Sequence, residues 1–282
     1  MSAKFPHLTG LMITLICLPL LAYGYEHPLF DAHLHYNPAH VDAVEPERVG
    51  SVLAGAGIGR AVILARDDTL IEAAMRAAPG VIVPFLDVYR PPANKDTWMH
   101  DPDLPERMRA RLDAGLETGE WRGIGELHLF ADDRHSPVFE ALVVMARERG
   151  LPVMIHGDPA VVDRAYEIEP DALILWAHAG TFPYPALIRD YLNRYPNLYA
   201  DLSMRSERLR GDGFMPLEWH DLLIEHADRF MVGADTFSST RWREIEQHTA
   251  DIREWLAQLP PDVAEQIAFG NAARLFGDVG TE

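Results

Sequence analysis

Two histidines separated by one residue are the first feature of this sequence that could do chemistry. His33 and His35 lie in the apolar segment 29–36, which has the composition of a short strand. Side chains at positions i and i+2 of a strand point to the same face. Both imidazoles can therefore bind one metal ion. The alternative is a pair of half-exposed strand histidines with no ligand, and residues elsewhere in the chain must decide between the two.

The same residue types recur at the ends of later apolar segments. They are Glu126 and His128 in 123–130, His156 in 152–157, His178 in 173–178 and Asp235 in 230–235. Each is a weak signal alone, because a single histidine after an apolar strand commonly packs in the core or at its rim. Burying several ionisable groups together is costly unless they are paired or bind a cation. A divalent metal removes that cost, so the set predicts a metal centre.

The elements that must position these residues alternate along the chain. Strands are expected at 30–36, 60–66, 81–89, 123–130, 152–157, 173–178, 198–204 and 230–235. Helices are expected at 46–56, 68–77, 104–117, 137–149, 159–167, 185–194, 217–227 and 243–259, followed by a helical tail at 261–277. Strict alternation predicts a parallel sheet with right-handed crossovers. Eight repeats predict an α/β fold of the (β/α)8 TIM-barrel type, with a doubly wound open sheet as the alternative.

A barrel would bring the candidate residues together. Its active site is built at the carboxyl ends of the strands, where these side chains lie. The length of 282 residues, 48% of them hydrophobic, suits one barrel, which takes about 250 residues. We therefore expect residues 25–282 to form a single domain. The long connections 90–103 and 206–216 would cover the mouth of the barrel.

The first 24 residues have the layout of a secretory signal peptide. Lys4 precedes an apolar run at 11–21, and Ala22 and Gly24 are small residues suited to cleavage. This predicts a secreted or periplasmic protein. An uncleaved leader acting as a membrane anchor is the alternative, although the run is shorter than the roughly 20 residues of a typical span. Cleavage would also remove Cys17, the single cysteine, which leaves neither a disulfide nor a thiolate ligand.

Charge limits the expected partners. The net charge is −18, and cleavage after Gly24 would make it one unit more negative. This argues against nucleic acid and, after cleavage, against membrane surfaces. The expected partner is a small-molecule substrate, and a homo-oligomer remains open. Arg66, Arg90 and Arg205 follow predicted strand ends and could bind an anionic group. Their alternative role is pairing with the abundant acids.

The order of these motifs resembles that of the amidohydrolase superfamily of metal-dependent barrels, including its amidohydrolase 2 and TatD-like members. The motifs are His-x-His on strand one, histidines on strands five and six, and an aspartate on strand eight. The Gly270-Asn271-Ala272 segment also resembles the family's closing helix. The resemblance implies a hydrolase that holds one or two divalent ions, with zinc favoured and manganese or iron as alternatives. The implied ligands are His33, His35, Glu126, His156, His178 and Asp235.

The resemblance also implies roles. Asp235 would accept a proton from metal-activated water and pass it to the leaving group of an ester, lactone, amide or phosphoester. His178 would either hold a second metal or polarise a substrate oxygen. Two further expectations come from the alternation of side chains along a strand. Asp31 would share the strand face of His33 and support a ligand histidine. His128 shares a face with Glu126 and would contact substrate or a ligand, or simply lie at the rim.

Strand four leaves two readings open. Many binuclear relatives bridge their metals with a carboxylated lysine there, but the only lysine after Lys4 is Lys95, which precedes the strand. Glu126 occupies the corresponding place, as in TatD-type hydrolases. The alternative resembles the decarboxylases typified by aminocarboxymuconate semialdehyde decarboxylase, in which Glu126 would not be a ligand. A metal-dependent binding protein without turnover and a structural barrel with a relic site complete the alternatives.

Overall fold

Eight parallel strands form the centre of the computed structural model, which describes residues 24–90 and 94–277. They are β1 (Leu29–Tyr36), β2 (Ile58–Ala65), β3 (Ile82–Leu86), β4 (Gly123–Leu129), β5 (Val153–Gly157), β6 (Ile174–Trp176), β7 (Leu198–Asp201) and β8 (Phe230–Met231). They pair in chain order. The segment after β8 returns to β1, where Ala32 N donates to Val232 O (2.9 Å) and Asp235 N donates to His33 O (2.7 Å). The predicted (β/α)8 barrel is confirmed.

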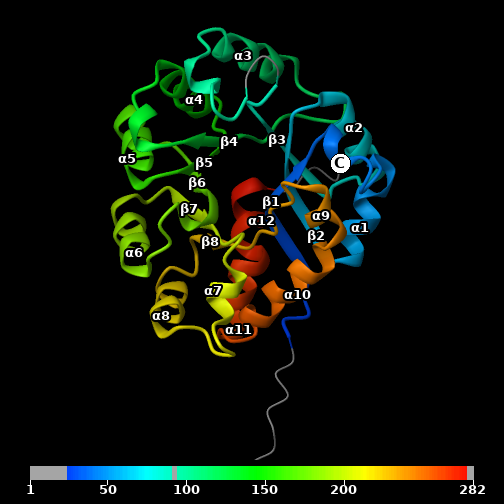
Figure 1. Ribbon diagram of the computed structural model, residues 1–282, viewed down its shortest axis with the longest axis vertical. Coiled ribbons are helices and arrows are strands. Elements are labelled where there is room, and N and C mark those ends of the chain that lie inside the picture. The colour runs from blue at the N-terminus through cyan, green and yellow to red at the C-terminus, as the bar shows by residue number, and fades with distance from the viewer. Residues whose placement is uncertain (1–23, 91–93, 278–282) are drawn as a thin grey trace, which may run out of the picture.

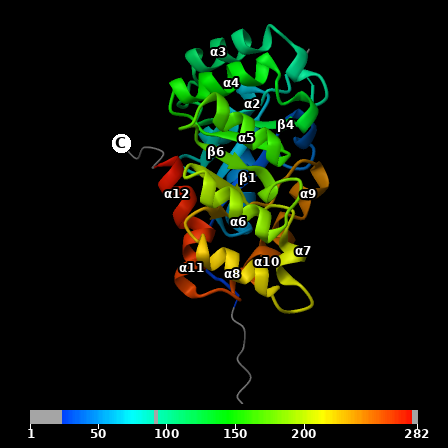
Figure 2. The ribbon, with the colours of Figure 1, turned by 90° about the vertical axis from the view of Figure 1, so that its left-hand side faces the viewer.

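Helices surround the strands on the outside, except for the last one, which lies across one end of the barrel (Figures 1 and 2). They are α1 (Val49–Gly55), α2 (Asp68–Ala77), α3 (Leu104–Ala114), α4 (Pro137–Glu148), α5 (Pro159–Ile168), α6 (Pro185–Arg194), α7 (Ser206–Arg210), α8 (Leu217–Glu225), α9 (Ser239–Arg243), α10 (Ile245–Leu256), α11 (Pro261–Glu265) and α12 (Asn271–Phe276). The short helices α7 and α9 were not predicted. They lie in the connections that follow β7 and β8, at the functional end of the barrel.

Local sequence explains where several helices begin. Asp67 caps α2 by accepting a hydrogen bond from Leu70 N at 2.9 Å. Ser136 caps α4 by accepting from the amides of Val138 and Phe139. Side-chain oxygens at this position satisfy amides that have no partner within the helix. Proline follows in the first turn of α4, where its missing amide hydrogen costs nothing.

Apolar side chains fill the amino-terminal half of the barrel. The inner cluster contains Phe30, Val62, Phe85 and Met154 together with Phe276 of α12. The ring of Phe276 lies 5.8 Å from that of Phe30 and 5.5 Å from that of Phe85, and α12 lies across the ring of strands in Figure 1. This end of the barrel is closed, so polar side chains inside it face the carboxyl end.

Two register shifts decide which side chains face inward. One lies in β1 between Asp31 and Leu34, and the other in β4 between Ile124 and Leu127. Because side chains alternate with a period of two, a shift of this kind changes which residues face the barrel interior. Phe30 lies in the inner cluster and precedes the shift between Asp31 and Leu34, whereas His33 and His35 face the site.

The predicted leader lies almost entirely outside the described residues, because the structure describes the chain from Gly24. Secretion therefore remains a prediction. Within 24–90 and 94–277, no helix is both long and apolar enough to cross a bilayer.

Candidate active site

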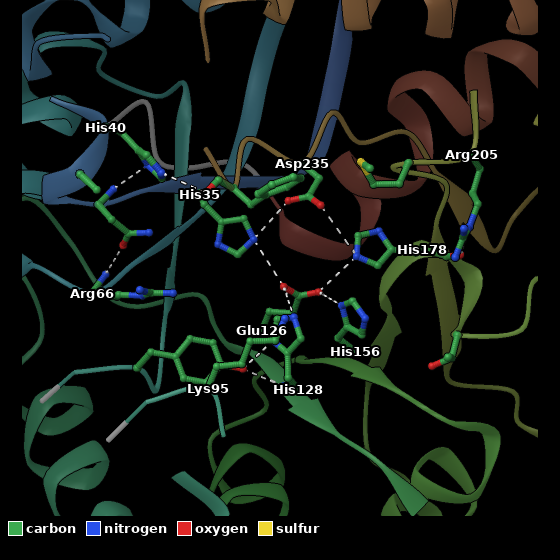
Figure 3. A pocket seen from close by; sticks show the side chains of 16 residues that line it. His35, His40, Arg66, Lys95, Glu126, His128, His156, His178, Arg205 and Asp235 are labelled. Carbon is green, nitrogen blue, oxygen red and sulfur yellow. Dashed lines mark hydrogen bonds and ion pairs between the residues drawn. The ribbon is translucent and has the colours of Figure 1, made fainter. Parts of the chain in front are cut away.

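A cavity of about 560 Å³ opens at the carboxyl ends of the strands (Figure 3). The predicted residues that line it are His35, Glu126, His128, His156, His178 and Asp235. His33 lies behind them and is fully buried. Side chains from five strand ends therefore meet in one place, as the sequence predicted. Their metal-ligand roles remain a prediction.

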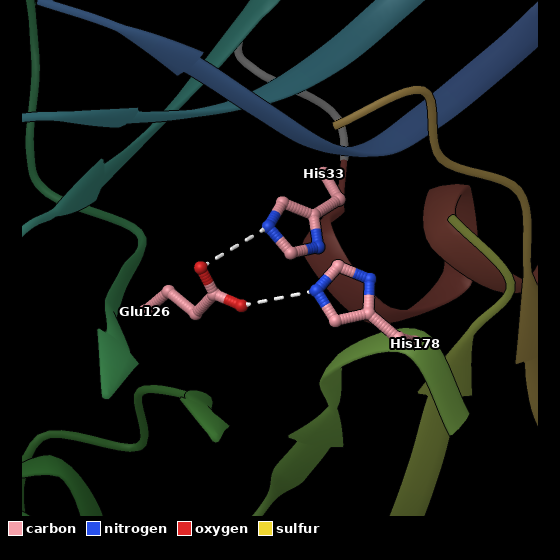
Figure 4. A group of neighbouring side chains, drawn as sticks. All are labelled: His33, Glu126 and His178. Atoms are coloured by element: carbon pink, nitrogen blue, oxygen red, sulfur yellow. Dashed lines mark ion pairs between the residues drawn. The ribbon is translucent and has the colours of Figure 1, made fainter. Parts of the chain in front are cut away.

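Glu126 lies at the centre of this group, and its two carboxylate oxygens face different histidines. Oε2 lies 3.6 Å from His33 Nε2 and 3.4 Å from His35 Nε2. Oε1 lies 2.8 Å from His156 Nδ1 and 3.4 Å from His178 Nε2. Figure 4 shows one carboxylate oxygen directed to His33 and the other to His178. A carboxylate placed in this way can contribute one oxygen to each of two cations.

The His33–His35 pair converges on Asp235. The two Nε2 atoms are 3.2 Å apart, and Asp235 Oδ1 lies 3.8 Å from the first and 3.4 Å from the second. Asp235 Oδ1 is buried and has no hydrogen-bond partner among the described residues. A buried acceptor of this kind normally has a partner. The three side chains thus fit a divalent cation, and imidazole and carboxylate donors suit zinc, manganese or iron.

Uncommon backbone conformations determine the direction of several of these side chains. Gly125 has φ of +141°, and a Cβ there would lie 2.7 Å from Met154 O, so only glycine fits beside Glu126. His178 (φ +59°) and Asp235 (φ +52°) both adopt the left-handed conformation. They also lie beyond the ends of β6 and β8, which are shorter than predicted. Uncommon conformations at non-glycine residues concentrate at functional sites.

Asp201 and Ser203 contact two histidines of the site, and the sequence analysis missed both residues. Asp201 Oδ2 lies 3.1 Å from His33 Nδ1. Ser203 Oγ lies 2.7 Å from His178 Nδ1 and donates to Asp201 Oδ1. Asp201 is fully buried, and an ionised carboxylate only accepts hydrogen bonds. Both histidines therefore carry hydrogen on Nδ1 and direct Nε2 toward the site.

The carboxylates and histidines of the site shift one another's pKa values. Burial alone would raise the pKa of Glu126 and of Asp235, but the neighbouring histidines hold both below their usual range. Burial alone would lower the pKa of His35, but Asp235 and Glu126 raise it to about 9. The pKa of His33 is likewise raised well above its usual value, against the effect of burial, by Asp201, Glu126 and Asp235. Without a metal, protons on these histidines balance the carboxylates.

Asp31 supports His33 as expected, but through the backbone amide and not from a shared strand face. Its carboxylate accepts hydrogen bonds from the backbone amides of His33 and Ala234, both at 2.9 Å. The register shift in β1 explains the difference, because Asp31 precedes the shift and does not share the face of His33. Burial raises the pKa of Asp31 to about 8, although the two amides oppose this. Asp31 thus connects the backbone at His33 to the backbone at Ala234, the residue before Asp235.

The four residues predicted to bind substrate have different surroundings. Arg66, Arg205 and His128 line the cavity. His128 lies 2.6 Å from the Tyr89 hydroxyl through Nδ1, and burial lowers its pKa to about 3. The prediction for Arg90 needs correction, because its exposed side chain pairs with Asp68 at 3.2 Å beside α3, outside this cavity. β3 ends at Leu86, so the chain has already turned outward at Arg90.

Further lining residues were not predicted. They are Asn37, Ala39, His40, Tyr89, Lys95, Thr181 and Met204. Most lie within a few residues after a strand, in connections whose conformation the sequence pattern does not specify. Asn37 and His40 directly follow the His-x-His strand, which was an available signal. Lys95 comes from the long connection after β3, which was expected at the mouth.

Comparison with known proteins decides the family. The sequence model of the amidohydrolase family matches residues 30–277. The chain belongs to the amidohydrolase family. It is thus an enzyme of the amidohydrolase type, and the predicted resemblance is confirmed. A search of curated proteins found no match.

Several solved structures share the fold at low sequence identity. A zinc-bound amidohydrolase from Burkholderia multivorans has a TM-score of 0.57 and 15% identity, covering 88% of this chain and 99% of that chain. A TatD homologue from Escherichia coli K12 has a TM-score of 0.56 and 14% identity, covering 88% and 97%. A guanine deaminase from C. acetobutylicum has a TM-score of 0.52 and 13% identity, covering 89% and 73%. At these identities the likeness concerns the fold.

Proposed function

We propose that this amidohydrolase is a metal-dependent hydrolase with two divalent cations bridged by Glu126. The observation that carries the proposal is the position of Glu126, with Oε2 facing His33 and His35 while Oε1 faces His156 and His178. A carboxylate whose two oxygens face separate groups of histidines suits a bridging ligand better than a residue outside the metal site. This arrangement favours the TatD-like reading over the decarboxylase reading.

The proposed ligands divide into two groups that share Glu126. His33, His35 and Asp235 form the first, and their ligand atoms lie within 4.8 Å of one another. His156 and His178 form the second, on the Oε1 side. Divalent cations bound here would acidify water and polarise the oxygen of a scissile ester, lactone, amide or phosphoester bond. Zinc bound to the Burkholderia relative supports zinc as the first candidate.

Asp235 is the proposed general base. The histidines hold its pKa below the usual range, against the effect of burial, so the carboxylate is ionised at neutral pH. Oδ1 faces the His33–His35 pair, and Oδ2 lies 3.9 Å from His178 Nε2. Asp235 can thus accept a proton inside the site and return it to a leaving group. His178 is held by Ser203 and directs Nε2 between the two carboxylates.

The proposed substrate is a small molecule that bears an anionic group. Arg66 and Lys95 line the cavity of a protein whose net charge is −18, so these cations interrupt a negative surface. Asp87 accepts a hydrogen bond from Arg66 Nε at 3.0 Å and orients the guanidinium. Solved structures with the same fold include a guanine deaminase and a Xaa-Pro dipeptidase. This range supports hydrolysis as the reaction class and leaves the bond type to experiment.

Metal analysis followed by an activity panel tests the proposal. The protein is stripped with chelator, reloaded with Zn²⁺, Mn²⁺ or Fe²⁺, and measured for bound metal and for hydrolysis of ester, lactone, amide and phosphoester substrates. We expect two ions per chain and hydrolysis restored by metal. One ion per chain with release of CO₂ from a carboxylate substrate would replace the proposal with the decarboxylase. Bound metal without turnover, or no bound metal, would favour a binding protein or a structural barrel.

We also propose that residues 1–24 direct export to the periplasm or medium. Amino-terminal sequencing of the protein recovered from these fractions tests this. A chain that begins near Tyr25 supports it, and an intact leader in the membrane fraction would indicate an anchor.

A further inference from the structure

We propose that Arg205 and Arg241 are positioning residues that hold the left-handed backbone of His178 and Asp235 through their carbonyl oxygens. The inference rests on the proposed function, in which these two residues serve the metal site. Neither arginine need touch the metal or the reacting atoms. Each would act by fixing the direction in which a functional side chain leaves the backbone.

The backbone at both sites is of a kind that needs support. His178 has φ of +59° and Asp235 has φ of +52°. A side chain of an L-residue is crowded against its own backbone in this conformation. It persists only where the surroundings impose it. Both residues follow the last residue of a strand by two or more positions, so ladder hydrogen bonds do not hold their carbonyl groups.

Arg241 supplies hydrogen-bond donors to the backbone at Asp235. Its Nε donates to Asp235 O at 2.6 Å, and its Nη2 donates to Ala234 O. Ala234 is 1% exposed and Asp235 is 5% exposed, so neither carbonyl can rely on bulk water. Arg241 belongs to α9, which is capped by Ser238 and follows Asp235 closely in the chain. The short unpredicted helix therefore presents the guanidinium to the backbone of the proposed base.

Arg205 makes the same pattern of contacts with the backbone at His178. Its Nε donates to His178 O at 2.8 Å, and its Nη2 donates to Gly180 O at 3.0 Å. Gly180 is itself left-handed, with φ of +86°. In both arginines, the Nε and Nη2 donors of one guanidinium bind two carbonyl oxygens at or next to a left-handed residue. A rigid fork of donors suits this task better than the flexible ammonium of lysine.

This assignment changes the role expected for Arg205. It lines the cavity, but the Nε edge of its guanidinium is engaged by the turn that carries His178. Figure 3 shows Arg205 on the His178 side, away from Arg66 and Lys95. Anion binding then falls to Arg66 and Lys95, and loss of Arg205 should disturb His178 before it disturbs substrate affinity.

Cobalt spectroscopy of variants tests the inference. Arg241→Met and Arg205→Met are compared with Arg241→Lys, Arg205→Lys and Asp235→Asn, each stripped and titrated with Co²⁺. Arg253→Met is the matched control, because Arg253 also donates to backbone carbonyls, those of Tyr25, His27 and Gly57, at the opposite end of the barrel. Circular dichroism and thermal unfolding report whether each variant folds, and the visible Co²⁺ spectrum reports the ligand geometry.

We expect Arg241→Met and Arg205→Met to fold, to shift the Co²⁺ spectrum and to lower Co²⁺ affinity by about tenfold or more, as loss of supporting contacts does at other metal sites. The lysine variants should recover part of both effects. Arg253→Met should change only thermal stability. If a methionine variant fails to fold, its lysine counterpart carries the same spectral test.

Two results would overturn the inference in distinguishable ways. If wild-type protein and Asp235→Asn give the same Co²⁺ spectrum, or if neither binds Co²⁺, the proposed function fails and the inference fails with it. If Asp235→Asn changes the spectrum but the arginine variants match Arg253→Met, the proposed function stands and the positioning role is wrong.

Discussion

The Oδ2 atom of Asp201 lies 3.1 Å from Nδ1 of His33, and both side chains are fully buried. The same carboxylate accepts from His178 N at 3.2 Å and from the hydroxyl of Ser203, which contacts His178 Nδ1. One aspartate thus sets the orientation of two proposed ligand histidines. Its burial opposes ionisation, but the charge of His33 holds its pKa below the usual range.

Replacement of Asp201 by asparagine should therefore weaken metal binding. The amide cannot accept as strongly from His33 Nδ1, so the ring loses its fixed tautomer and orientation. We expect metal affinity to fall about 10- to 100-fold, measured by competition with a chelator. Asp163→Asn is the control, because Asp163 accepts hydrogen bonds from Tyr191 and Tyr195 away from the site. Equal affinities in the two variants would contradict the role given to Asp201.

Replacement of Glu126 by glutamine tests the bridging carboxylate. The amide keeps the size of the side chain but removes the charge, and its nitrogen cannot bind a cation. We expect the metal content to fall from two ions per chain to one, measured by elemental analysis and native mass spectrometry. Glu140→Gln is the control, because Glu140 pairs with Arg164 on the surface. Unchanged metal content in Glu126→Gln would return the decarboxylase reading, in which Glu126 is not a ligand.

The sequence was sufficient for the fold and for much of the site. Buried strands alternate with helices, and this pattern determines the barrel and places His33, Glu126 and Asp235 at one end. The failures have local causes. The register shift in β1 reverses the face expected for Asp31. Asp201 is 168 residues from His33 in the chain, and a single acid at a strand end gives no sign of that contact.

The arginines illustrate a second limit of sequence reasoning. Arg66, Arg90 and Arg205 all follow predicted strands, but the direction of each side chain depends on the turn that carries it. Arg66 is oriented by Asp87 toward the cavity, whereas Arg90 pairs with Asp68 outside it. Arg205 was predicted correctly to reach the site region, but its contacts with backbone carbonyls could not be read from spacing.

Replacement of Asp235 by asparagine should lower turnover while leaving most of the metal bound. The variant keeps one oxygen near His33 and His35 but cannot accept a proton. We expect most of the metal to remain bound and kcat to fall about 10²- to 10⁴-fold, measured on whichever substrate of the hydrolysis panel is turned over. Asp228→Asn, an exposed aspartate that pairs with Arg229, should match the wild type. Full turnover in Asp235→Asn would show that the proton acceptor lies elsewhere.

Replacement of Arg66 by glutamine should affect anionic substrates selectively. Loss of a charge-assisted hydrogen bond of about 1.5–3 kcal/mol would raise KM for a carboxylate-bearing substrate roughly 10- to 150-fold. A neutral analogue should be affected much less, and kcat should change little. Arg90→Gln provides the matched control, since Arg90 lies outside the cavity and pairs with Asp68. Equal effects on charged and neutral substrates would exclude Arg66 as an anion contact.

The raised pKa values of His33 and His35 predict that, as the pH rises, the metal-free protein loses stability and gains affinity for metal. The pKa of His35 is about 9 in the folded protein, above its usual 6.5. Between these values the folded chain binds more protons than the unfolded chain, so the stability of the metal-free protein should fall as pH rises. Asp31, with a pKa of about 8, acts in the same direction.

Metal binding must displace these protons, because a ligand nitrogen needs its lone pair. Affinity for Zn²⁺ should therefore rise by about tenfold per pH unit for each displaced proton between pH 6.5 and 9. Calorimetry in buffers of different ionisation enthalpy would count the protons released, and thermal unfolding would follow both forms. His35→Gln should flatten both profiles. Zinc affinity that is independent of pH over this range would show that the histidines are neutral before metal binds.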